Sequence, residues 1–303
     1  ADTKGQVHPL TTLQNVSYAL PVIPSIMLLA PMMGVIQGVY AKHYGVALST
    51  LAMIILLSRI FDAVSDPMIG YCSDRYRMKH GTRKPFILVG GLLLLVCGYF
   101  LYIPPAELTP VYLGFWLIAF YMAYTLFEIP HISWPCDFAS QSEDKIKLYS
   151  YRVVAYHVGL LLFFCVPLLP IFPSTEITPV TLKVAFFVAA GLAIPFLLQA
   201  VRAVPRGNQP LSTGELQQQP ILHLLRSIPR EIVNNKPFLI FVVPFLCGGF
   251  AVGMWFGLVY IYVDAYLGMG DQFAQMFLVA FIVGILVAPL WYQIATRIGK
   301  KKS

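Results

Sequence analysis

Eight long apolar segments divide this sequence of 303 residues. Each approaches the roughly 20 residues that an α-helix needs to cross the hydrocarbon core of a bilayer. The strands of a membrane barrel would be about half as long and would alternate polar with apolar residues. The pattern therefore predicts an all-α, polytopic membrane bundle with about eight transmembrane helices. The predicted spans are residues 16–41, 48–72, 85–103, 110–134, 149–172, 181–203, 237–263 and 273–296.

The amino-acid composition agrees with a lipid environment. Hydrophobic residues make up 58% of the chain and charged residues 12%, whereas a soluble domain has about 45–50% apolar and about 25% charged residues. A net charge of +7 would suggest a nucleic-acid partner for a soluble protein. In a membrane chain the same charge encodes orientation. We therefore expect membrane lipid, and no nucleic acid, as a partner.

Lysine and arginine are concentrated on one side of the predicted membrane. Seventeen of the 21 lie in the N-terminal segment, in the connections after even-numbered spans, or at the C-terminal end. Only Lys42 and Lys183 fall on the other side, and Arg59 and Arg152 lie within spans. Basic residues favour the cytoplasmic side. The bias predicts a protein of the cell (inner or plasma) membrane with a cytoplasmic N-terminus.

The longest polar stretch, residues 204–236, separates six predicted spans from two. We expect residues 1–203 to form an N-terminal six-helix bundle, 204–236 a cytoplasmic linker, and 237–303 the first two helices of a second bundle. A weak repeat supports two halves, because Pro67 and Arg75 in span two are eight residues apart, as are Pro289 and Arg297 in span eight. Such a repeat of six spans would leave four spans unaccounted for, either because the chain is trimmed or because it is naturally short.

Three acidic residues lie inside predicted spans: Asp62 and Asp66 in span two, and Glu128 in span four. A charge at the bilayer centre costs roughly 2.5–3.5 kcal/mol on insertion scales. Acidic side chains in such positions usually face the bundle interior or a water-filled cavity and serve a function. These three residues are therefore the first candidates for a functional site.

The spacing of Arg59, Asp62 and Asp66 puts all three on one helix face, with Ser65 at its edge. Two carboxylates one turn apart repel each other in a low dielectric unless a cation or a proton intervenes. Arg59 can neutralise one of them. The other would be satisfied by Na⁺, held by carboxylate and hydroxyl oxygens, or by a proton shared within the pair. The alternative is a purely structural salt bridge from Arg59 to one acid.

A second polar group is predicted around span four. Thr125 and Glu128 are three residues apart and share a face. Thr125 offers a hydroxyl to an ion, and Glu128 an acceptor for a substrate hydroxyl or ammonium. Arg152, at the start of span five, is a plausible forked donor, and the alternative is that it pairs with Glu128 for packing alone.

Three further side chains lie near Glu128. Tyr124 and Trp134 could stack on a sugar ring. His131 is better explained as a packing or hydrogen-bonding residue than as a ligand.

The connection between spans two and three carries an ordered series of glycine, acidic and basic residues. Glycine allows helices to approach closely, and the acid can accept hydrogen bonds from basic residues or a helix N-terminus. We interpret the series as a rigid hinge that affects conformational gating. Its members are Gly70, Asp74, Arg75, Gly81, Arg83 and Lys84.

Several of these motifs occur together in one family. Residues 59–70 read Arg-Ile-Phe-Asp-Ala-Val-Ser-Asp-Pro-Met-Ile-Gly, and residues 124–130 read Tyr-Thr-Leu-Phe-Glu-Ile-Pro. Asp74-Arg75, residues 81–86, Tyr151-Arg152 and residues 235–238 add further matches. The sequence resembles the glycoside–pentoside–hexuronide:cation symporters, the melibiose-permease branch of the major facilitator superfamily, over most of residues 10–240.

The resemblance implies that Asp62 and Asp66 hold the coupling Na⁺, Li⁺ or H⁺, with Thr125 nearby. It also implies that Glu128 and Arg152 contact the sugar. The sequence departs from sugar-transporting members in span one, which contains no acid between residues 18 and 40. It also has Ile132 where they have a tryptophan and Ser65 where they have an asparagine. The ion half of the site is thus better preserved than the sugar half.

We therefore predict a secondary transporter that couples Na⁺ or H⁺ to a sugar or glycoside-like solute by alternating access. No Ser/His/Asp order, P-loop or paired His/Cys set supports an enzyme, and no cofactor is expected besides the coupling ion. A uronide or a lysolipid is an alternative solute. A truncated, non-transporting subunit that scaffolds a larger complex with protein partners is an alternative function.

Overall fold

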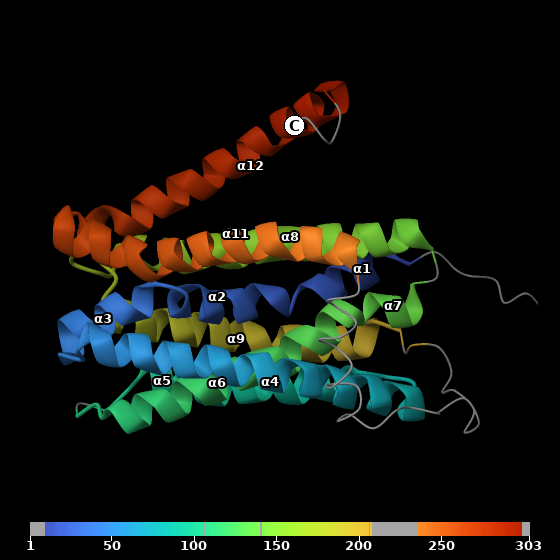
Figure 1. Cartoon of the computed structure of the whole chain (residues 1–303), viewed down its shortest axis with the longest axis horizontal. Helices are drawn as coiled ribbons and strands as arrows, with labels where there is room; N and C mark the ends of the chain where they lie inside the picture. The colour runs from blue at the N-terminus through green and yellow to red at the C-terminus, as the bar shows by residue number, and fades with distance from the viewer. Residues whose placement is uncertain (1–9, 106, 140, 206, 208–234, 299–303) are drawn as a thin grey trace, which may run out of the picture.

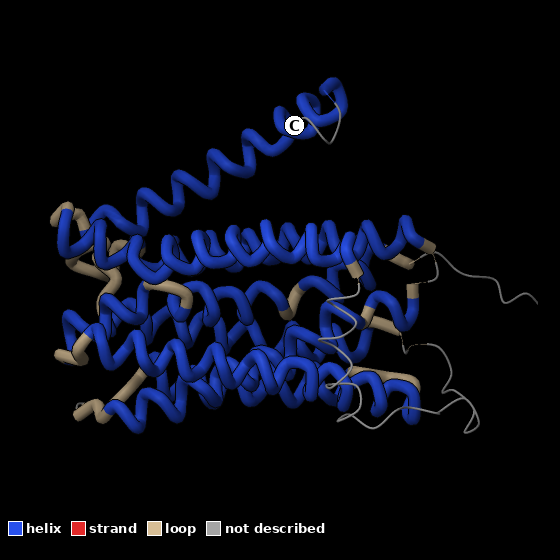
Figure 2. Tube along the Cα trace, in the orientation of Figure 1, coloured by secondary structure: helices blue, strands red, loops and turns tan. Residues whose placement is uncertain are grey.

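The computed structural model describes residues 10–105, 107–139, 141–205, 207 and 235–298, with side chains to residue 287. Every regular element within this part of the chain is a helix (Figure 2). Most of the predicted linker and the side chains of Pro289 and Arg297 lie outside the described residues. The helices are α1 (Thr12–Ala19), α2 (Val22–Met32), α3 (Val35–Tyr44), α4 (Leu48–His80), α5 (Lys84–Tyr102), α6 (Pro110–Ser133), α7 (Pro135–Phe138), α8 (Ser142–Cys165), η1 (Val166–Leu168), α9 (Pro179–Ala203), α11 (Lys236–Ile261), η2 (Tyr262–Tyr266), η3 (Gly270–Gln272) and α12 (Phe273–Ile298).

The prediction of eight membrane-spanning segments is confirmed. Eight helical stretches in the described part of the chain are long and apolar enough to cross a bilayer. Local sequence explains where two of them start. Thr109 and Thr178 accept hydrogen bonds from backbone N–H groups of the first turns of α6 and α9. A proline follows each threonine at the first helical position, where its missing N–H costs nothing.

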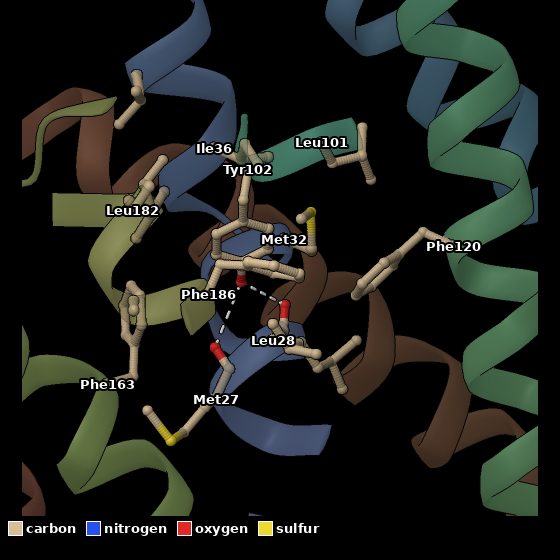
Figure 3. Close-up of a cluster of buried hydrophobic side chains, with 14 of the residues drawn as sticks. Met27, Leu28, Met32, Ile36, Leu101, Tyr102, Phe120, Phe163, Leu182 and Phe186 are labelled. Carbon is tan, nitrogen blue, oxygen red and sulfur yellow. Dashed lines mark hydrogen bonds between the residues drawn. The ribbon is translucent and has the colours of Figure 1, made fainter. Parts of the chain in front are cut away.

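The helices α1 to α9 pack side by side into one bundle (Figure 1). Its core lies between helices, while apolar side chains also cover the outer faces. Figure 3 shows part of that core, where Tyr102 of α5 is surrounded by side chains from other helices. The Tyr102 hydroxyl donates to the backbone oxygens of Leu28 (2.7 Å) and Met27 (3.3 Å), so this buried polar group is satisfied inside the bundle.

The first span is not the single helix over residues 16–41 that the apolar pattern predicts. It is divided into α1, α2 and α3, with breaks at Pro21 and Gly34. Proline lacks a backbone N–H and interrupts the i→i−4 ladder, and the Ile23 N–H turns back to Leu20 three residues earlier. The second break is where α11 approaches, because a Cβ at Gly34 would lie 2.0 Å from the Phe256 oxygen.

The second span is longer than predicted. Helix α4 continues to His80, so Asp74 and Arg75 lie within the helix and do not form the connection to span three. At 1.5 Å per residue its 33 residues extend about 50 Å, well beyond a hydrocarbon core of about 30 Å. The charged last turns therefore project from the membrane. Gly81, with φ +69°, ends the helix in the left-handed conformation that glycine adopts readily.

Helices α11 and α12 contact the rest of the bundle mainly at one end. A Cβ at Gly38 would lie 2.1 Å from the ring of Tyr260, which brings α3 and α11 into close contact. Phe164 of α8 packs against Phe273 and Phe277. From this end α12 slopes away from the bundle (Figure 1). The division into domains at residues 203 and 237 stays a prediction.

Candidate functional site: acidic residues between α4 and α6

Asp62 is buried on α4 and has an arginine partner. Its Oδ2 lies 3.1 Å from the Arg59 guanidinium, one turn earlier on the same helix. The same guanidinium lies over the ring of Tyr121 on α6, 4.0 Å from the ring centroid. A cation is attracted to the face of an aromatic ring. Arg59 therefore joins Asp62 to α6.

Asp66 lies one turn further along α4, level with Thr125 of α6. Two contacts set the register of these helices: a Cβ at Gly114 would meet Ile54 at 3.8 Å, and one at Gly70 would meet Ile129 at 3.7 Å. The paired positions are therefore about 60 residues apart at both points. The same offset places residues 65 and 66 beside residue 125. Thr125 is buried, so its hydroxyl is held inside the bundle at the level of Asp66.

Both aspartates keep a carboxylate oxygen without a protein partner. Oδ1 of Asp62 and Oδ1 of Asp66 are buried and accept no hydrogen bond from the described residues. Ser65, which lies between the two aspartates in the sequence, is also buried. Its hydroxyl donates to the Asp62 backbone oxygen at 3.5 Å. Buried polar atoms are normally paired. Two orphan carboxylate oxygens one turn apart are the chemistry that a monovalent cation or a proton would satisfy.

Glu128 belongs to a second polar group, centred on Arg152 of α8. One guanidinium nitrogen of Arg152 contacts Glu128 Oε1, and the other lies 2.6 Å from Nδ1 of His131. Arg152 and His131 are buried, and Glu128 keeps a buried Oε2 without a partner. Within the described residues, no group of three His, Cys, Asp or Glu side chains is placed to hold a metal ion.

The two aromatic residues considered for sugar stacking lie differently. Tyr124 is partly buried and lies one turn before Glu128 on α6. Trp134 is fully buried among Tyr18, His131 and Phe138. The suggestion that Trp134 stacks on a solute is therefore wrong, because its ring has no free face.

Two of the residues predicted as a hinge, Asp74 and Arg83, form an ion pair at the expected cytoplasmic end. Arg83 lies 2.5 Å from Asp74 and 2.9 Å from Asp137, and it donates to Ser73 at 3.0 Å. Arg77 contacts the other oxygen of Asp137 at 3.1 Å. Asp137, at the end of α7, thus ties span four to the turn between spans two and three.

Two other members of the hinge series have different partners. Lys84 donates to the backbone oxygens of Val201 (2.7 Å) and Val204 (2.6 Å) at the end of α9. Arg75 instead donates to the Tyr71 hydroxyl on its own helix.

A further ionic group lies at the opposite end and was not found from the sequence. The Lys42 ammonium is 2.7 Å from Glu176 and 2.9 Å from Asp264, and His43 is 3.8 Å from Glu176. Hydrogen bonds to Asp264 and to Glu176 raise the pKa of Lys42. The only signal in the sequence was that Lys42 is one of two basic residues expected on that side. Because Asp264 belongs to η2, this group joins α3 to the segment that follows α11.

Comparison with known proteins identifies one family. Residues 17–303 match the family model described as MFS/sugar transport protein. A putative glycoside/cation symporter of Escherichia coli, YagG, is 29% identical over 125 residues, which are 40% of this chain and 27% of the relative. An uncharacterized Bacillus subtilis symporter, YjmB, is 24% identical over 206 residues, 66% of this chain and 43% of the relative.

A longer but weaker match is to a human protein. The sodium-dependent lysophosphatidylcholine symporter 1 of Homo sapiens is 20% identical over 278 residues, 82% of this chain and 51% of the relative. The chain spans about half or less of the length of these curated relatives.

Proposed function

Because this chain belongs to the MFS/sugar transport protein family, we propose that it carries the cation site of a symporter that moves a glycoside-like solute by alternating access. One observation supports this function above the rest. Asp62 and Asp66, one helical turn apart, each keep a buried carboxylate oxygen that has no partner among the described residues. Two of the relatives are named as symporters, which agrees with this proposal.

The proposed cation is Na⁺, Li⁺ or H⁺, and it is a substrate of the transport cycle. Asp62 and Asp66 would hold it, with the hydroxyls of Ser65 and Thr125 as additional oxygens. Arg59 neutralises Asp62 in part, so one added positive charge balances the pair. In this proposal Glu128, Arg152 and Tyr124 contact the solute.

The α1–α9 bundle and the segment from α11 to η3 contact each other at the end that carries Lys42. Side-chain contacts between the α1–α9 bundle and the segment from α11 to η3 include the Lys42–Asp264 pair, the donation from Tyr260 to the Ile177 oxygen, and the contact of Thr175 with the Asp271 oxygen. With the N-terminus in the cytoplasm, as the basic residues favour, these contacts close the outer end. In that orientation α11 is exposed over its cytoplasmic half.

Asp62→Asn and Asp66→Asn are each expected to reduce cation-driven uptake at least about tenfold without loss of folded protein, because amides cannot carry the charge that binds the ion. The full protein is reconstituted in liposomes, and uptake of radiolabelled 4-nitrophenyl galactoside is measured under imposed Na⁺, Li⁺ or proton gradients. Glu143→Gln, an exposed acid at the start of α8, is the control and should match the wild type.

Two results would count against this proposal. Wild-type uptake that is indifferent to Na⁺, Li⁺ and pH, or uptake unaffected by Asp66→Asn, would remove the case for coupling. Loss of folded protein in both Asn variants would favour a structural salt bridge between Arg59 and Asp62.

A second solute class is favoured by a separate observation. The relatives named lysophosphatidylcholine symporters align with 82% of this chain, a longer stretch than the 40% matched by the glycoside/cation symporter. The first span also has no acid that could bind sugar hydroxyls. Uptake of labelled lysophosphatidylcholine in the same liposomes distinguishes the two classes. Cation-driven uptake of the lipid and none of the galactoside would replace the glycoside by a lysolipid.

Lys42→Glu is expected to open the outer end, because three carboxylates then face one another in place of one ammonium between two. The measurement is labelling of a cysteine at the buried position Val263 by an impermeant maleimide, in protein without the native cysteines. The labelling rate should rise about fivefold or more, as the loss of partly exposed ion pairs of about 0.2–1 kcal/mol each would give.

Lys183→Glu makes the same charge change at an exposed position of α9 and should leave the rate unchanged. Equal labelling in Lys42→Glu and the wild type would exclude Lys42 as an outer-end contact. The raised pKa of Lys42 keeps it charged at neutral pH. Its contribution is lost only as the pH rises above the usual lysine value of about 10.4, so labelling should not vary through Lys42 between about pH 6 and 9.

A further inference from the structure

His131 is a fully buried titratable side chain to which the proposed transport cycle gives no role. It lies on α6, one turn after Glu128. Its imidazole stacks on the ring of Tyr18 with centroids 4.6 Å apart and planes at 11°. On its other side it lies near Phe127, at 5.1 Å. The ring is therefore fixed in place, and each of its two nitrogens has one polar neighbour.

The break in the first span supplies the neighbour of one nitrogen. Helix α1 ends at Ala19, and Pro21 has no N–H to continue the ladder. The carbonyl of Tyr18 lies in this last turn, where helix carbonyls lose their intrahelical donors. His131 Nε2 is 2.9 Å from that oxygen. In return the Tyr18 hydroxyl donates to the His131 carbonyl at 3.3 Å.

These contacts leave one protonation state for the ring. A carbonyl oxygen only accepts, so Nε2 must carry the proton. The neighbour of Nδ1 is the Arg152 guanidinium at 2.6 Å, which only donates. Nδ1 must therefore be an acceptor, and the imidazole is the neutral Nε2–H tautomer. An imidazolium would direct an N–H at a guanidinium.

We propose that His131 is a positioning residue that holds Arg152 against Glu128, with its tautomer set by the Tyr18 carbonyl at the break in the first span. This inference rests on the proposed function in one respect, that Arg152 and Glu128 contact the solute. The Tyr18 carbonyl, in the last turn before the break in the first span, holds His131, and His131 in turn holds the Arg152 guanidinium. A helix break in span one thereby fixes a charged group between spans four and five.

Two substitutions separate positioning from packing. Asparagine places its amide oxygen near the position of Nδ1 and keeps an acceptor for Arg152. Glutamine places its amide nitrogen near Nε2 and keeps the donor to Tyr18. KM is measured for whichever probe the wild type transports, 4-nitrophenyl galactoside or lysophosphatidylcholine. His131→Gln should raise KM about tenfold or more, as expected for a lost hydrogen bond to a charged group. The KM of His131→Asn should stay within about threefold of the wild-type value.

The concentration of Na⁺ that gives half-maximal uptake should not change in either variant, because Asp62 and Asp66 do not contact His131. His157→Gln, on α8 with its Nδ1 at the Val153 oxygen, is the control for losing a histidine. Equal KM values for the Asn and Gln variants, or a Na⁺ requirement that changes together with KM, would overturn the proposal.

A measurement without solute keeps the inference separate from the proposed function. Nitrogen-15 NMR of histidine-labelled wild-type protein in detergent, with His131 assigned by its loss in His131→Asn, should show the neutral Nε2–H tautomer at pH 6 to 8. An Nδ1–H tautomer or an imidazolium would overturn the proposal. If the wild type transports neither probe, the proposed function fails, and this spectrum alone decides the placement of His131.

Discussion

Arg152→Met is expected to lower the free energy of unfolding by about 3–5 kcal/mol, the usual cost of removing one partner from a buried ion pair. The reason is that Glu128 already has one unpartnered buried oxygen, Oε2, and would then lose the partner of Oε1 as well. His131 Nδ1 would also lose its donor. The measurement is the thermal unfolding of purified full protein in detergent, followed by size-exclusion chromatography.

The double variant Glu128→Gln with Arg152→Met tests the cause. Removing both charges should recover most of the lost stability, because no uncompensated charge then remains in the bundle. Uptake should stay abolished, since both proposed solute contacts are gone. A double variant as unstable as Arg152→Met alone would show that packing of the arginine, and not the Glu128 charge, determines the loss.

The second large effect is expected at Gly90 of α5, which lies against the backbone of α6. A Cβ there would lie 2.4 Å from the backbone nitrogen of Phe127 and 2.7 Å from the carbonyl carbon of Leu126. Backbone atoms cannot move aside as a flexible side chain can, so Gly90→Ala must push two helices apart. Overpacking costs about 1–3 kcal/mol and more when the backbone has to shift.

Gly191→Ala is the matched control, because it makes the same change within α9 at a position with open space around the added carbon. It should be neutral or slightly stabilising, since alanine favours a helix over glycine. Folded yield and unfolding temperature of the two variants are compared in the same detergent. A Gly90→Ala protein as stable as Gly191→Ala would mean that α5 and α6 do not pack as closely as described.

Much of the fold could be predicted because lipid imposes a simple rule on sequence. A helix must remain apolar for the thickness of the hydrocarbon core, so long apolar segments report spans directly. The residues at which the helices end were less predictable. Asp74 and Arg75 are charged, which suggested a connection, but a helix that has left the hydrocarbon carries charges without cost. Their place within α4 depends on the packing beyond the membrane surface.

The breaks in the first span could not be predicted from local sequence. Prolines occur in several spans, and neighbouring groups can satisfy the carbonyls they free. Pro67 lies inside the continuous α4, whereas Pro21 separates α1 from α2. At the break that follows α1, the carbonyl of Tyr18 has a partner from another helix: the ring of His131, 113 residues away in the sequence. No periodicity within the first span contains that information.

The candidate site, too, could be predicted only in part from the sequence. The spacing of Arg59, Asp62 and Asp66 placed them on one helix face, and the contact of Arg59 with Asp62 lies within that face. The roles of these residues in ion and solute binding stay predictions. The Lys42–Glu176–Asp264 group joins three segments that are far apart in the chain, so only tertiary structure could show it.

The close contacts at Gly34 and Gly38 have a mechanical consequence. These glycines bring the start of α3 and the end of α11 together where a methyl group would not fit. This close joint can act as a fulcrum, because Gly34 lies on the backbone of α11 and Gly38 lies on the flat ring of Tyr260. Enlarging either glycine should then slow turnover and leave the affinity for solute unaltered.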